Sequence, residues 1–406
     1  MSPESPHARR RGLIYRKLIG LTLHVTHDVD RLALLGEVRE ALRGLMEFES
    51  YAWDERGVLT LRGRLTGPAD QLYGVVRSRM EGLGFTPFLR RKGQADELVA
   101  TPGVVERKAP RVWLPVALFL TSVFTSLLAG ALYEWRDPIA DGNALMATIV
   151  AIATTPALLL SGLPFAGALM GILFVHEMGH YVVGRLRRAP VSLPYFIPLP
   201  PPLSITGTMG AVIVQREPME DRRTILEIGI AGPLAGLAVA IPLLLYGLST
   251  STVAPPPAGG YMQEGNSLLY GALKLAVFGQ WLPGGGVDVQ LNSMAWGAWI
   301  GLLVTMLNLL PIGQLDGGHI AYALLGRMAD YLAYGMIGLC VVLGMLLPDN
   351  GTWLIWGVLA LLIGPRHPPP LNDISRLGAG HVALAVFGLV VFALLFMPAP
   401  LRQVGG

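Results

Sequence analysis

The segment 171–184 places two potential metal ligands and one potential base inside an apolar stretch. His176 and His180 are four residues apart, so on a helix their side chains share one face and can reach the same ion. Glu177 lies beside them as a candidate general base, and the spacing H-E-x-x-H is typical of zinc-dependent peptidases. The alternative is a buried polar cluster that holds helices together, although ionisable groups in hydrocarbon usually have a function.

A catalytic zinc site needs a third protein ligand and an open position for water. Asp316 is the best candidate, because it closes a hydrophobic segment whose helix Pro311 and Gly313 interrupt. Broken helices at membrane depth are tolerated where they line a polar cavity. Asp316 could also be the N-cap of a helix that starts near Gly318, and both roles are compatible. His319 is a rival third ligand.

The composition is that of a polytopic membrane protein, with 52% hydrophobic and 15% charged residues and a mean hydropathy of +0.51. Charges concentrate at the beginning: residues 1–111 hold 19 of the 31 Lys and Arg and 14 of the 28 Asp and Glu. We therefore expect a soluble domain over 1–111 and a transmembrane domain over 112–406. A net charge of +3 is too small to suggest nucleic-acid binding.

Within the soluble domain the pattern indicates a small α/β fold. Strands are expected at 21–25 and 58–65, and helices at 31–46 and 69–83. No metal-binding motif is present there, so we interpret the domain as regulatory or substrate-recruiting. No secretory signal peptide is expected, since no apolar core follows the arginines at 9–11.

The transmembrane domain is expected to be α-helical with seven or eight spans. Candidate spans are 112–133, 144–161, 164–184, 226–248, 293–311, 331–347, 352–364 and 379–397. The segment 352–364 is short for a full crossing, which needs about 20 residues. Between the third and fourth spans, prolines exclude helix and the apolar run 209–214 favours a strand. An amphipathic helix is expected near 268–278.

Basic residues can all lie on one side if the spans alternate from the third onward: Arg185, Arg187, Arg188, Arg216, Arg222, Arg223, Arg327, Arg366 and Arg376. That side should be the cytoplasm, so the His-Glu helix runs inward. Counting back through two spans places the soluble domain outside, whereas Arg107, Lys108 and Arg111 favour the inside. A miscounted span before residue 164 would remove this conflict.

Two motifs make the chain resemble the site-2 protease family of intramembrane zinc metalloproteases. H-E-x-x-H is matched in full, and the family's N-P-x-x-x-L-D-G is matched by Pro311, Leu315, Asp316 and Gly317. Leu310 replaces the family's asparagine, with Asn308 two residues earlier as a possible substrate-positioning residue. The resemblance covers about 144–330 and favours Asp316 over His319.

A third motif at 231–236 holds Gly232 and Gly236, a spacing suited to close helix packing. Together with the soluble domain ahead of the core, the sequence resembles most the branch that contains the plastid gravitropism-deficient proteases.

The resemblance implies a cytoplasm-facing zinc site held by His176, His180 and Asp316, with Glu177 as the catalytic base. It implies an endopeptidase that cleaves membrane proteins in or near their transmembrane segments, as in regulated intramembrane proteolysis. The expected location is a cell membrane, such as a bacterial inner membrane, and the expected partners are a single-span substrate and the lipid bilayer. The strand at 209–214 is a candidate edge for holding an extended substrate. The alternatives are a proteolytically silent scaffold or chaperone and a transporter.

Overall fold

The computed structural model describes residues 24–104, 112–215, 217–257, 259, 261–347 and 351–404. The chain forms two compact units that divide between Val104 and Val105. The arginines at 9–11 and the basic residues Arg107, Lys108, Arg111 and Arg216 lie outside the described residues.

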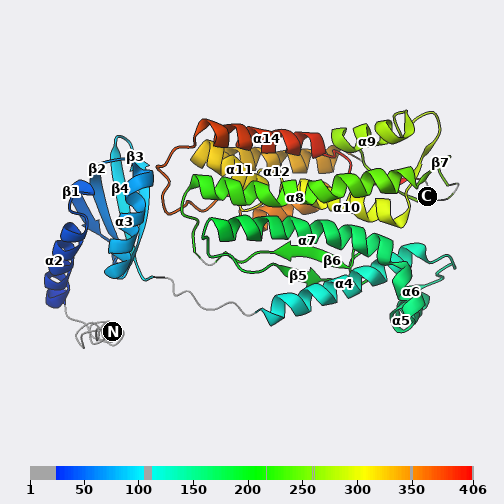
Figure 1. Ribbon diagram of the computed structural model, residues 1–406, viewed down its shortest axis with the longest axis horizontal. Helices are drawn as coiled ribbons and strands as arrows, with labels where there is room; N and C mark the ends of the chain where they lie inside the picture. The colour runs from blue at the N-terminus through cyan, green and yellow to red at the C-terminus, as the bar shows by residue number, and fades with distance from the viewer. Residues whose placement is uncertain are drawn as a thin grey trace. The chain divides into compact units, whose positions relative to one another are not determined.

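The first unit is a four-stranded antiparallel sheet with two helices (Figure 1). Its elements are α2 (His24–Ala41), β1 (Met46–Trp53), β2 (Leu59–Leu65), α3 (Ala69–Gly82), β3 (Phe85–Lys92) and β4 (Ala95–Pro102), with strand order β1-β2-β4-β3. Buried side chains alternate along β3 and β4. Tyr73 of α3 donates a hydrogen bond to the carbonyl of Pro87 at 2.7 Å, which fixes α3 on the sheet.

Two of the four predicted elements of this unit match the structure, namely β2 and α3. The predicted strand at 21–25 is wrong where it is described, because His24 and Val25 belong to α2. The predicted helix at 31–46 starts earlier and ends at Ala41, since Met46 already pairs with Leu65 in the sheet. Pairing between distant residues overrode the local helical spacing here.

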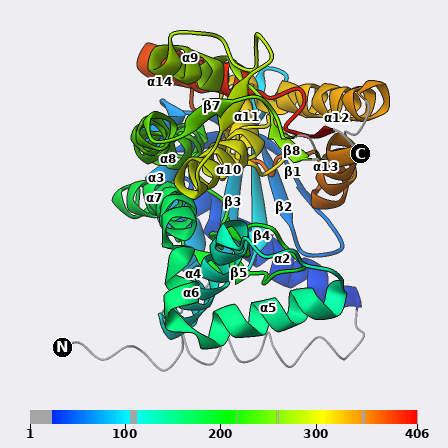
Figure 2. The same ribbon diagram turned by 90° about the vertical axis from the view of Figure 1, so that its right-hand side faces the viewer.

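The second unit is mainly helical, with several long helices that run side by side (Figures 1 and 2). The helices are α4 (Trp113–Glu134), α5 (Gly142–Thr154), α6 (Pro156–Ser161), α7 (Leu163–Leu186), α8 (Arg222–Ser249), α9 (Leu268–Phe278), α10 (Ser293–Asn308), α11 (Asp316–Leu325), the 3-10 turn η1 (Gly326–Met328), α12 (Ala329–Leu346), α13 (Gly351–Ile363) and α14 (Ala379–Leu395).

Among the described residues, four helical segments are long and apolar enough to cross a membrane: Trp113–Glu134, Leu163–Leu186, Arg222–Ser249 and Asp316–Leu346. The last contains α11, η1 and α12. Helices α5, α9, α10, α13 and α14 are apolar but shorter. The unit therefore has the character of a multi-pass membrane protein. Only four of the described helical segments are long enough to cross a membrane, which does not confirm the predicted seven or eight spans.

The predicted span at 144–161 is wrong. It is broken at Thr155, whose backbone is extended (φ −112°, ψ 104°), because the following Pro156 disfavours helical conformation in the residue before it. Two short helices of 13 and 6 residues result, and α5 lies across the direction of the long helices (Figures 1 and 2). Without this span, α4 and α7 are successive antiparallel helices, and α4 starts at the end of the unit where α7 finishes (Figure 1).

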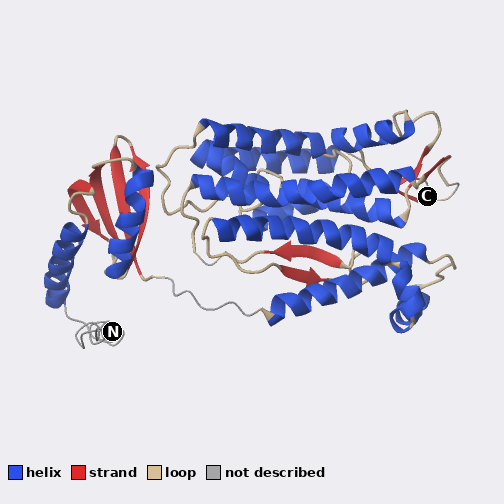
Figure 3. Ribbon diagram, in the orientation of Figure 1, coloured by secondary structure: helices blue, strands red, loops and turns tan. Residues whose placement is uncertain are grey.

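A two-stranded antiparallel sheet lies between α7 and α4 (Figure 3). It consists of β5 (Tyr195–Pro198) and β6 (Thr208–Val212), so a strand is present in the predicted segment 209–214. Phe196 of β5 packs edge-on against Phe119 of α4, with the ring centroids 4.9 Å apart. In the described chain β6 pairs in a sheet only with β5, which leaves its other edge open.

The predicted helix break before Asp316 is confirmed: α10 ends at Asn308 and α11 begins at Asp316. The turn between them has to be compact. A Cβ atom on Gly317 would lie 1.9 Å from the carbonyl oxygen of Leu309, and one on Gly318 would lie 2.3 Å from that of Gly313. Only glycine fits at these two positions, which explains the paired glycines after the aspartate.

Small sheets and α9 cover the opposite end of the unit. Strands β7 (Thr252–Ala254) and β9 (Asp288–Gln290) pair there, as do β8 (Tyr261–Glu264) and β10 (Leu401–Val404). Lys274 of α9 is fully buried, with its Nζ 2.9 Å from Glu264 and 3.6 Å from Asp288.

Candidate metal centre

Helix α7 presents its two histidines toward the interior of the unit. His176 is 1% exposed and His180 is 8% exposed. The helix ends at Leu186, so His180 lies about 9 Å and His176 about 15 Å below that end, at about 1.5 Å per residue. The two imidazoles are therefore inside the helical bundle but close to one of its ends.

Asp316 meets both histidines from the start of α11. His176 Nε2 is 3.1 Å from Asp316 Oδ2, and His180 Nε2 is 3.2 Å from Asp316 Oδ1. The ligand atoms of the three side chains all lie within 4.8 Å of one another. Tetrahedral ligands at about 2.0–2.1 Å from a zinc ion are about 3.3 Å apart, so the three residues fit a zinc ion.

The second ring nitrogen of His180 is held by the neighbouring helix. Its Nδ1 lies 2.6 Å from the carbonyl oxygen of Ile228 in α8. A carbonyl can only accept, so Nδ1 carries the proton and Nε2 keeps its lone pair for a metal. Metal-binding histidines are commonly oriented by such a hydrogen bond.

Glycines in α8 make room for the histidine rings. A Cβ on Gly232 would lie 2.0 Å from His180 Nε2, and one on Gly236 would lie 3.1 Å from His176 Nδ1. A Cβ on Gly229 would lie 2.7 Å from the Cβ of His319. The small-residue motif at 231–236 therefore has a direct role beyond general helix packing, because it leaves space for the ligand rings.

Asn308, the last residue of α10, lies at the same place. Asn308 Nδ2 is 3.4 Å from His176 Nε2, so its amide lies beside the candidate ligands. Leu315 is the N-cap residue of α11 and Asp316 makes no capping hydrogen bond, which makes the predicted N-cap role of Asp316 wrong. His319 does not join the group of ligand atoms; its Nδ1 pairs with His367 Nε2 at 2.6 Å.

Glu177 is buried next to the ligands, with 6% of its surface exposed. In the described part of the chain, Asp316 forms ion pairs only with the two histidines, and Glu177 forms none. The cluster thus combines two imidazoles and two carboxylates without a Lys or Arg partner. A divalent cation would supply the missing positive charge, and nitrogen and oxygen ligands are those that zinc takes.

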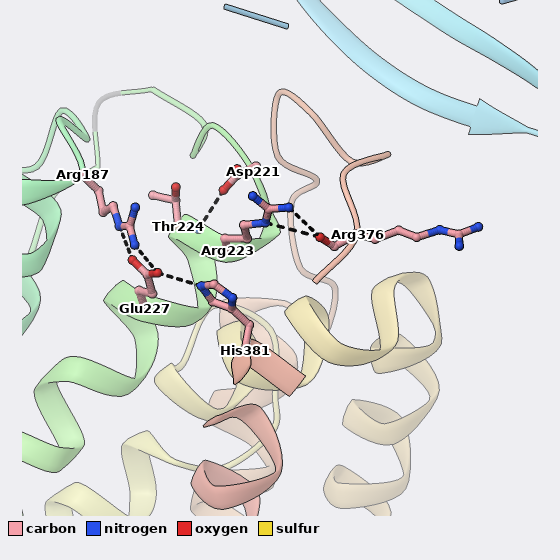
Figure 4. Close-up of polar contacts among 7 residues, drawn as sticks. All are labelled: Arg187, Asp221, Arg223, Thr224, Glu227, Arg376 and His381. Carbon is pink, nitrogen blue, oxygen red and sulfur yellow. Dashed lines mark hydrogen bonds and ion pairs between the residues drawn. The ribbon is translucent and has the colours of Figure 1, made fainter. Parts of the chain in front are cut away.

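Charged contacts near the end of the bundle hold α7, α8 and α14 together (Figure 4). Arg187, just after α7, forms a paired ion contact with Glu227 of α8, and His381 Nε2 of α14 lies 2.9 Å from Glu227 Oε1. Arg223 donates to the carbonyl of Arg376 at 3.1 Å. Since Glu227 precedes Ile228, the two contacts of Glu227 lie next in sequence to the backbone carbonyl that orients His180.

The structure brings together every predicted site residue: His176, Glu177, His180, Asn308 and Asp316. Three further features were not predicted, namely the carbonyl of Ile228, the contact of Gly232 with the His180 ring, and the partner of His319. The first two carry no side-chain signal in the sequence. The third could have been sought among the remaining histidines, but His367 is 48 residues away from His319.

Comparison with known proteins agrees with this geometry. The profile of peptidase family M50 matches residues 164–345, which include both histidines, Glu177 and Asp316. The probable zinc metalloprotease EGY1, chloroplastic, of Arabidopsis thaliana is 33% identical over 245 residues, covering 59% of this chain and 43% of the relative. The probable zinc metalloprotease EGY2, chloroplastic, of the same plant is 28% identical over 361 residues, covering 86% of this chain and 62% of the relative.

The chain thus spans about two fifths to three fifths of the length of these relatives. No solved structure matches it. The family resemblance predicted from the two motifs is confirmed: residues 164–345 are a peptidase family M50 domain, and the chain is homologous to the plastid EGY zinc metalloproteases.

Proposed function

We propose that this protein is an intramembrane zinc endopeptidase that hydrolyses peptide bonds in or near the transmembrane segments of other membrane proteins. The observation that carries the proposal is the convergence of His176, His180 and Asp316 within 4.8 Å, beside the buried Glu177. The M50 domain and the zinc metalloprotease relatives support it.

His176, His180 and Asp316 would hold the zinc ion. When bound, zinc acts as a Lewis acid that lowers the pKa of water and polarises a carbonyl group. Glu177 accepts the proton of the attacking water and delivers it to the leaving amine. Asn308, whose amide lies 3.4 Å from His176, is placed to donate a hydrogen bond to the substrate backbone.

The open edge of β6 is the proposed docking strand for the substrate. A transmembrane helix must unwind before cleavage, because its peptide bonds are shielded by their own hydrogen bonds. An extended peptide can then pair with a free strand edge. Large apolar side chains on and after β6 are exposed, with Met209 at 67%, Val212 at 50% and Val214 at 47%, and they suit an apolar partner.

We place the metal end of the bundle toward the cytoplasm of a cell membrane, such as a bacterial inner membrane. The arginines Arg185, Arg187, Arg222 and Arg223 lie at the ends of α7 and α8 on that side, and basic residues are enriched on cytoplasmic faces. The relatives named above are chloroplastic. The cytoplasmic placement therefore rests on the arginine pattern and not on these relatives. The start of α4 lies at the same end, which would put the residues before α4 on the cytoplasmic side and remove the conflict in the charge pattern.

The first unit is proposed to recruit or restrict substrates. All candidate ligands lie in the second unit, so the first need not take part in the chemistry. Removing residues 1–104 should leave zinc binding and some cleavage of a single-span peptide. A folded, zinc-loaded truncation without any activity would contradict this role.

A reconstituted assay tests the main proposal. The purified chain is incubated in detergent with a labelled single-span peptide, and products are located by mass spectrometry. We expect cleavage in or near the apolar segment, loss of cleavage with a zinc chelator, and recovery after zinc is added back. A zinc-loaded chain that cleaves no single-span peptide would favour a scaffold, and zinc-dependent solute uptake by vesicles would favour a transporter.

A further inference from the structure

The ion pair between Arg187 and Glu227 joins helix α7 to helix α8 (Figure 4). Arg187 follows the last residue of α7, and its backbone N–H still donates to the carbonyl of Val183 at 2.9 Å. Arg187 is seven residues after His180, and seven residues make almost two full helical turns. Arg187 therefore lies on the face of α7 that carries the two histidines.

The geometry of this ion pair fixes a direction as well as a distance. Arg187 Nε donates to one oxygen of the Glu227 carboxylate, and Nη2 donates to the other. Two parallel hydrogen bonds between planar groups hold both side chains in one orientation. The pair therefore resists sliding of α8 along α7 as well as separation of the two helices.

The residue after Glu227 is Ile228, whose carbonyl oxygen lies 2.6 Å from His180 Nδ1. On α7, Arg187 and His180 are about 10 Å apart along the axis, at about 1.5 Å per residue, and the long side chain of Arg187 bridges this distance. The same turn of α8 is thus joined to two different turns of α7. A slide of α8 that misaligns the carbonyl of Ile228 would also break the ion pair.

The packing surfaces of the two helices offer little resistance to sliding near the ligands. Gly232 and Gly236 of α8 face the two histidine rings. On α7, a Cβ atom on Gly179 would lie 2.6 Å from the carbonyl oxygen of Ala231 in α8. Small residues allow this close approach, but they lack the side-chain ridges that interlock packed helices. Polar contacts must therefore fix the register of α8 on α7.

A second partner of Glu227 comes from helix α14. His381 Nε2 lies 2.9 Å from Glu227 Oε1, an oxygen that also takes part in the ion pair (Figure 4). Helix α14 packs closely on the core, since a Cβ atom on Gly388 would lie 3.0 Å from side chains of α8 and α11. It lies outside the segment 164–345 that the family profile matches. The C-terminal helix therefore adds a support that the family match does not include.

We propose that Glu227 is a positioning residue of the metal centre, which holds the carbonyl of Ile228 on His180. Arg187 and His381 are the two partners through which it acts. With the carbonyl in place, the proton of a neutral His180 stays on Nδ1 and Nε2 keeps its lone pair for a metal. Without it, the imidazole can carry its proton on Nε2 or rotate, and either change weakens metal binding. The inference rests on the proposed zinc site and adds a support outside the ligand set.

Metal binding by the full chain in detergent tests this role. Glu227→Gln keeps the size of the side chain and removes its charge. The zinc Kd, measured by competition with a chromophoric chelator, should rise about tenfold or more, as is typical when a residue behind a metal ligand is changed. With cobalt(II) in place of zinc, the visible absorption spectrum should shift, because it reports the geometry of the ligands.

The first unit offers a matched control. Arg62 and Glu97 form an ion pair whose side chains are 47% and 14% exposed, close to the 50% and 15% of Arg187 and Glu227. The candidate ligands all lie in the other unit. Glu97→Gln should therefore leave the zinc Kd and the cobalt spectrum unchanged.

Further variants test whether the partners act through Glu227. Arg187→Ala should raise the zinc Kd as much as Glu227→Gln does, and the double variant should lose no more than either single one, because the two side chains act as a pair. Arg187→Lys keeps the charge but not the two parallel bonds, and His381→Phe removes the contact from α14. Each of these should raise the Kd several-fold.

Thermal unfolding shows which variants are folded, and Arg187→Lys carries the test where Glu227→Gln does not fold. An unchanged zinc Kd and cobalt spectrum in the folded variants would overturn the positioning role and leave the metal centre intact. Equal changes in Glu97→Gln and Glu227→Gln would overturn it as well, since the effect would then not depend on the place of the ion pair. No zinc binding by the unaltered chain would overturn the metal centre itself and the proposed function with it.

Discussion

Two clusters of buried charges lie toward opposite ends of helix α8, and they differ in where their positive charge comes from. Near the end of the second unit that carries α9, Lys274 supplies a cation within the cluster, 2.9 Å from Glu264 and 3.6 Å from Asp288. Near the other end, the buried carboxylates of Glu177 and Asp316 have no Lys or Arg partner in the described chain. Asp316 instead contacts the imidazoles of His176 and His180.

The difference separates a structural cluster from a functional one. The cluster around Lys274 is closed: Tyr270 donates to Glu264 at 3.2 Å, Gln263 donates to Asp288 at 2.8 Å, and the ammonium group lies 4.7 Å from the Tyr270 ring centroid. The cluster around Asp316 is electrostatically incomplete and adjoins a cavity of about 240 Å³. A buried charge needs a partner, so the second cluster requires a cation from outside the chain.

Removing a ligand should have the largest effect. Asp316→Ala deletes the oxygens that face both histidines, so we expect zinc affinity and peptide cleavage to fall by roughly 10² or more. Metal analysis after dialysis, beside the cleavage assay, measures both. His319→Ala is the control and should retain zinc. The opposite result, with zinc kept in Asp316→Ala and lost in His319→Ala, would make His319 the third ligand.

Removing the base should separate metal binding from chemistry. Glu177→Gln keeps the size of the side chain, so zinc should remain near one ion per chain while kcat falls by roughly 10² to 10⁴. Metal content and single-turnover cleavage are the readouts. Cleavage at the wild-type rate would exclude a mechanism through Glu177 and leave the metal centre without its assigned base.

The closed cluster should respond to loss of its cation by unfolding rather than by losing zinc. Lys274→Met leaves Glu264 and Asp288 buried without a cation, which costs about 3–5 kcal/mol in the free energy of unfolding. Burial already raises the pKa of Glu264, and Lys274 partly counteracts this rise. In the variant Glu264 should bind its proton more tightly when folded than when unfolded. Stability is then lost as pH rises above the unfolded pKa of a Glu, about 4.3.

Thermal unfolding in detergent at about pH 5 and about pH 8 checks this expectation. The difference between wild type and Lys274→Met should be larger at the higher pH, and the double variant Lys274→Met with Glu264→Gln should regain part of the loss. Zinc binding by the folded fraction should stay unchanged. A loss of stability that is independent of pH would show that the cation of Lys274 does not act through Glu264.

A smaller effect is expected from the glycine beneath the ligand ring. Gly232→Ala would place a Cβ 2.0 Å from His180 Nε2, so the ring or helix α8 must shift, and zinc affinity should drop by about tenfold, or 1.4 kcal/mol. Gly171→Ala, in the ligand helix α7 with nothing within 4 Å of the added Cβ, is the matched control. Equal zinc affinities in the two variants would show that the close approach of α8 is not needed.

Labelling of single cysteines tests on which side of the membrane each of the two clusters lies. With Cys340, the one cysteine of the chain, replaced by Ala, single cysteines at Val112 and Arg187 should react from the same side and a cysteine at Gln280 from the opposite side. A membrane-impermeant thiol reagent on oriented vesicles gives the answer. Val112 and Arg187 reacting from opposite sides would restore a span between α4 and α7.

The grouping of the candidate metal ligands could be predicted from the sequence better than the membrane spans. Four-residue spacing on a helix fixes the direction of two side chains, so His176 and His180 could be paired without a structure. Pro311 and Gly313 marked the helix break before Asp316, which the structure contains. The prediction of a span at 144–161 was wrong because hydropathy averaged over a window does not detect a helix break. Here Pro156 disfavours helical backbone at Thr155, and the helix ends there.

By itself the sequence determined the local features: the metal-binding spacing, the helix break, the apolar segments and the charge-rich beginning of the chain. These follow from rules that act within a few residues, such as helical periodicity and the missing N–H of proline. Only the tertiary structure decided which distant groups meet: the carbonyl of Ile228 on His180, Gly232 beneath its ring, and His367 as the partner of His319. A backbone carbonyl exists at every residue, so its use as an acceptor depends on how the helices pack, and packing is a property of the whole fold.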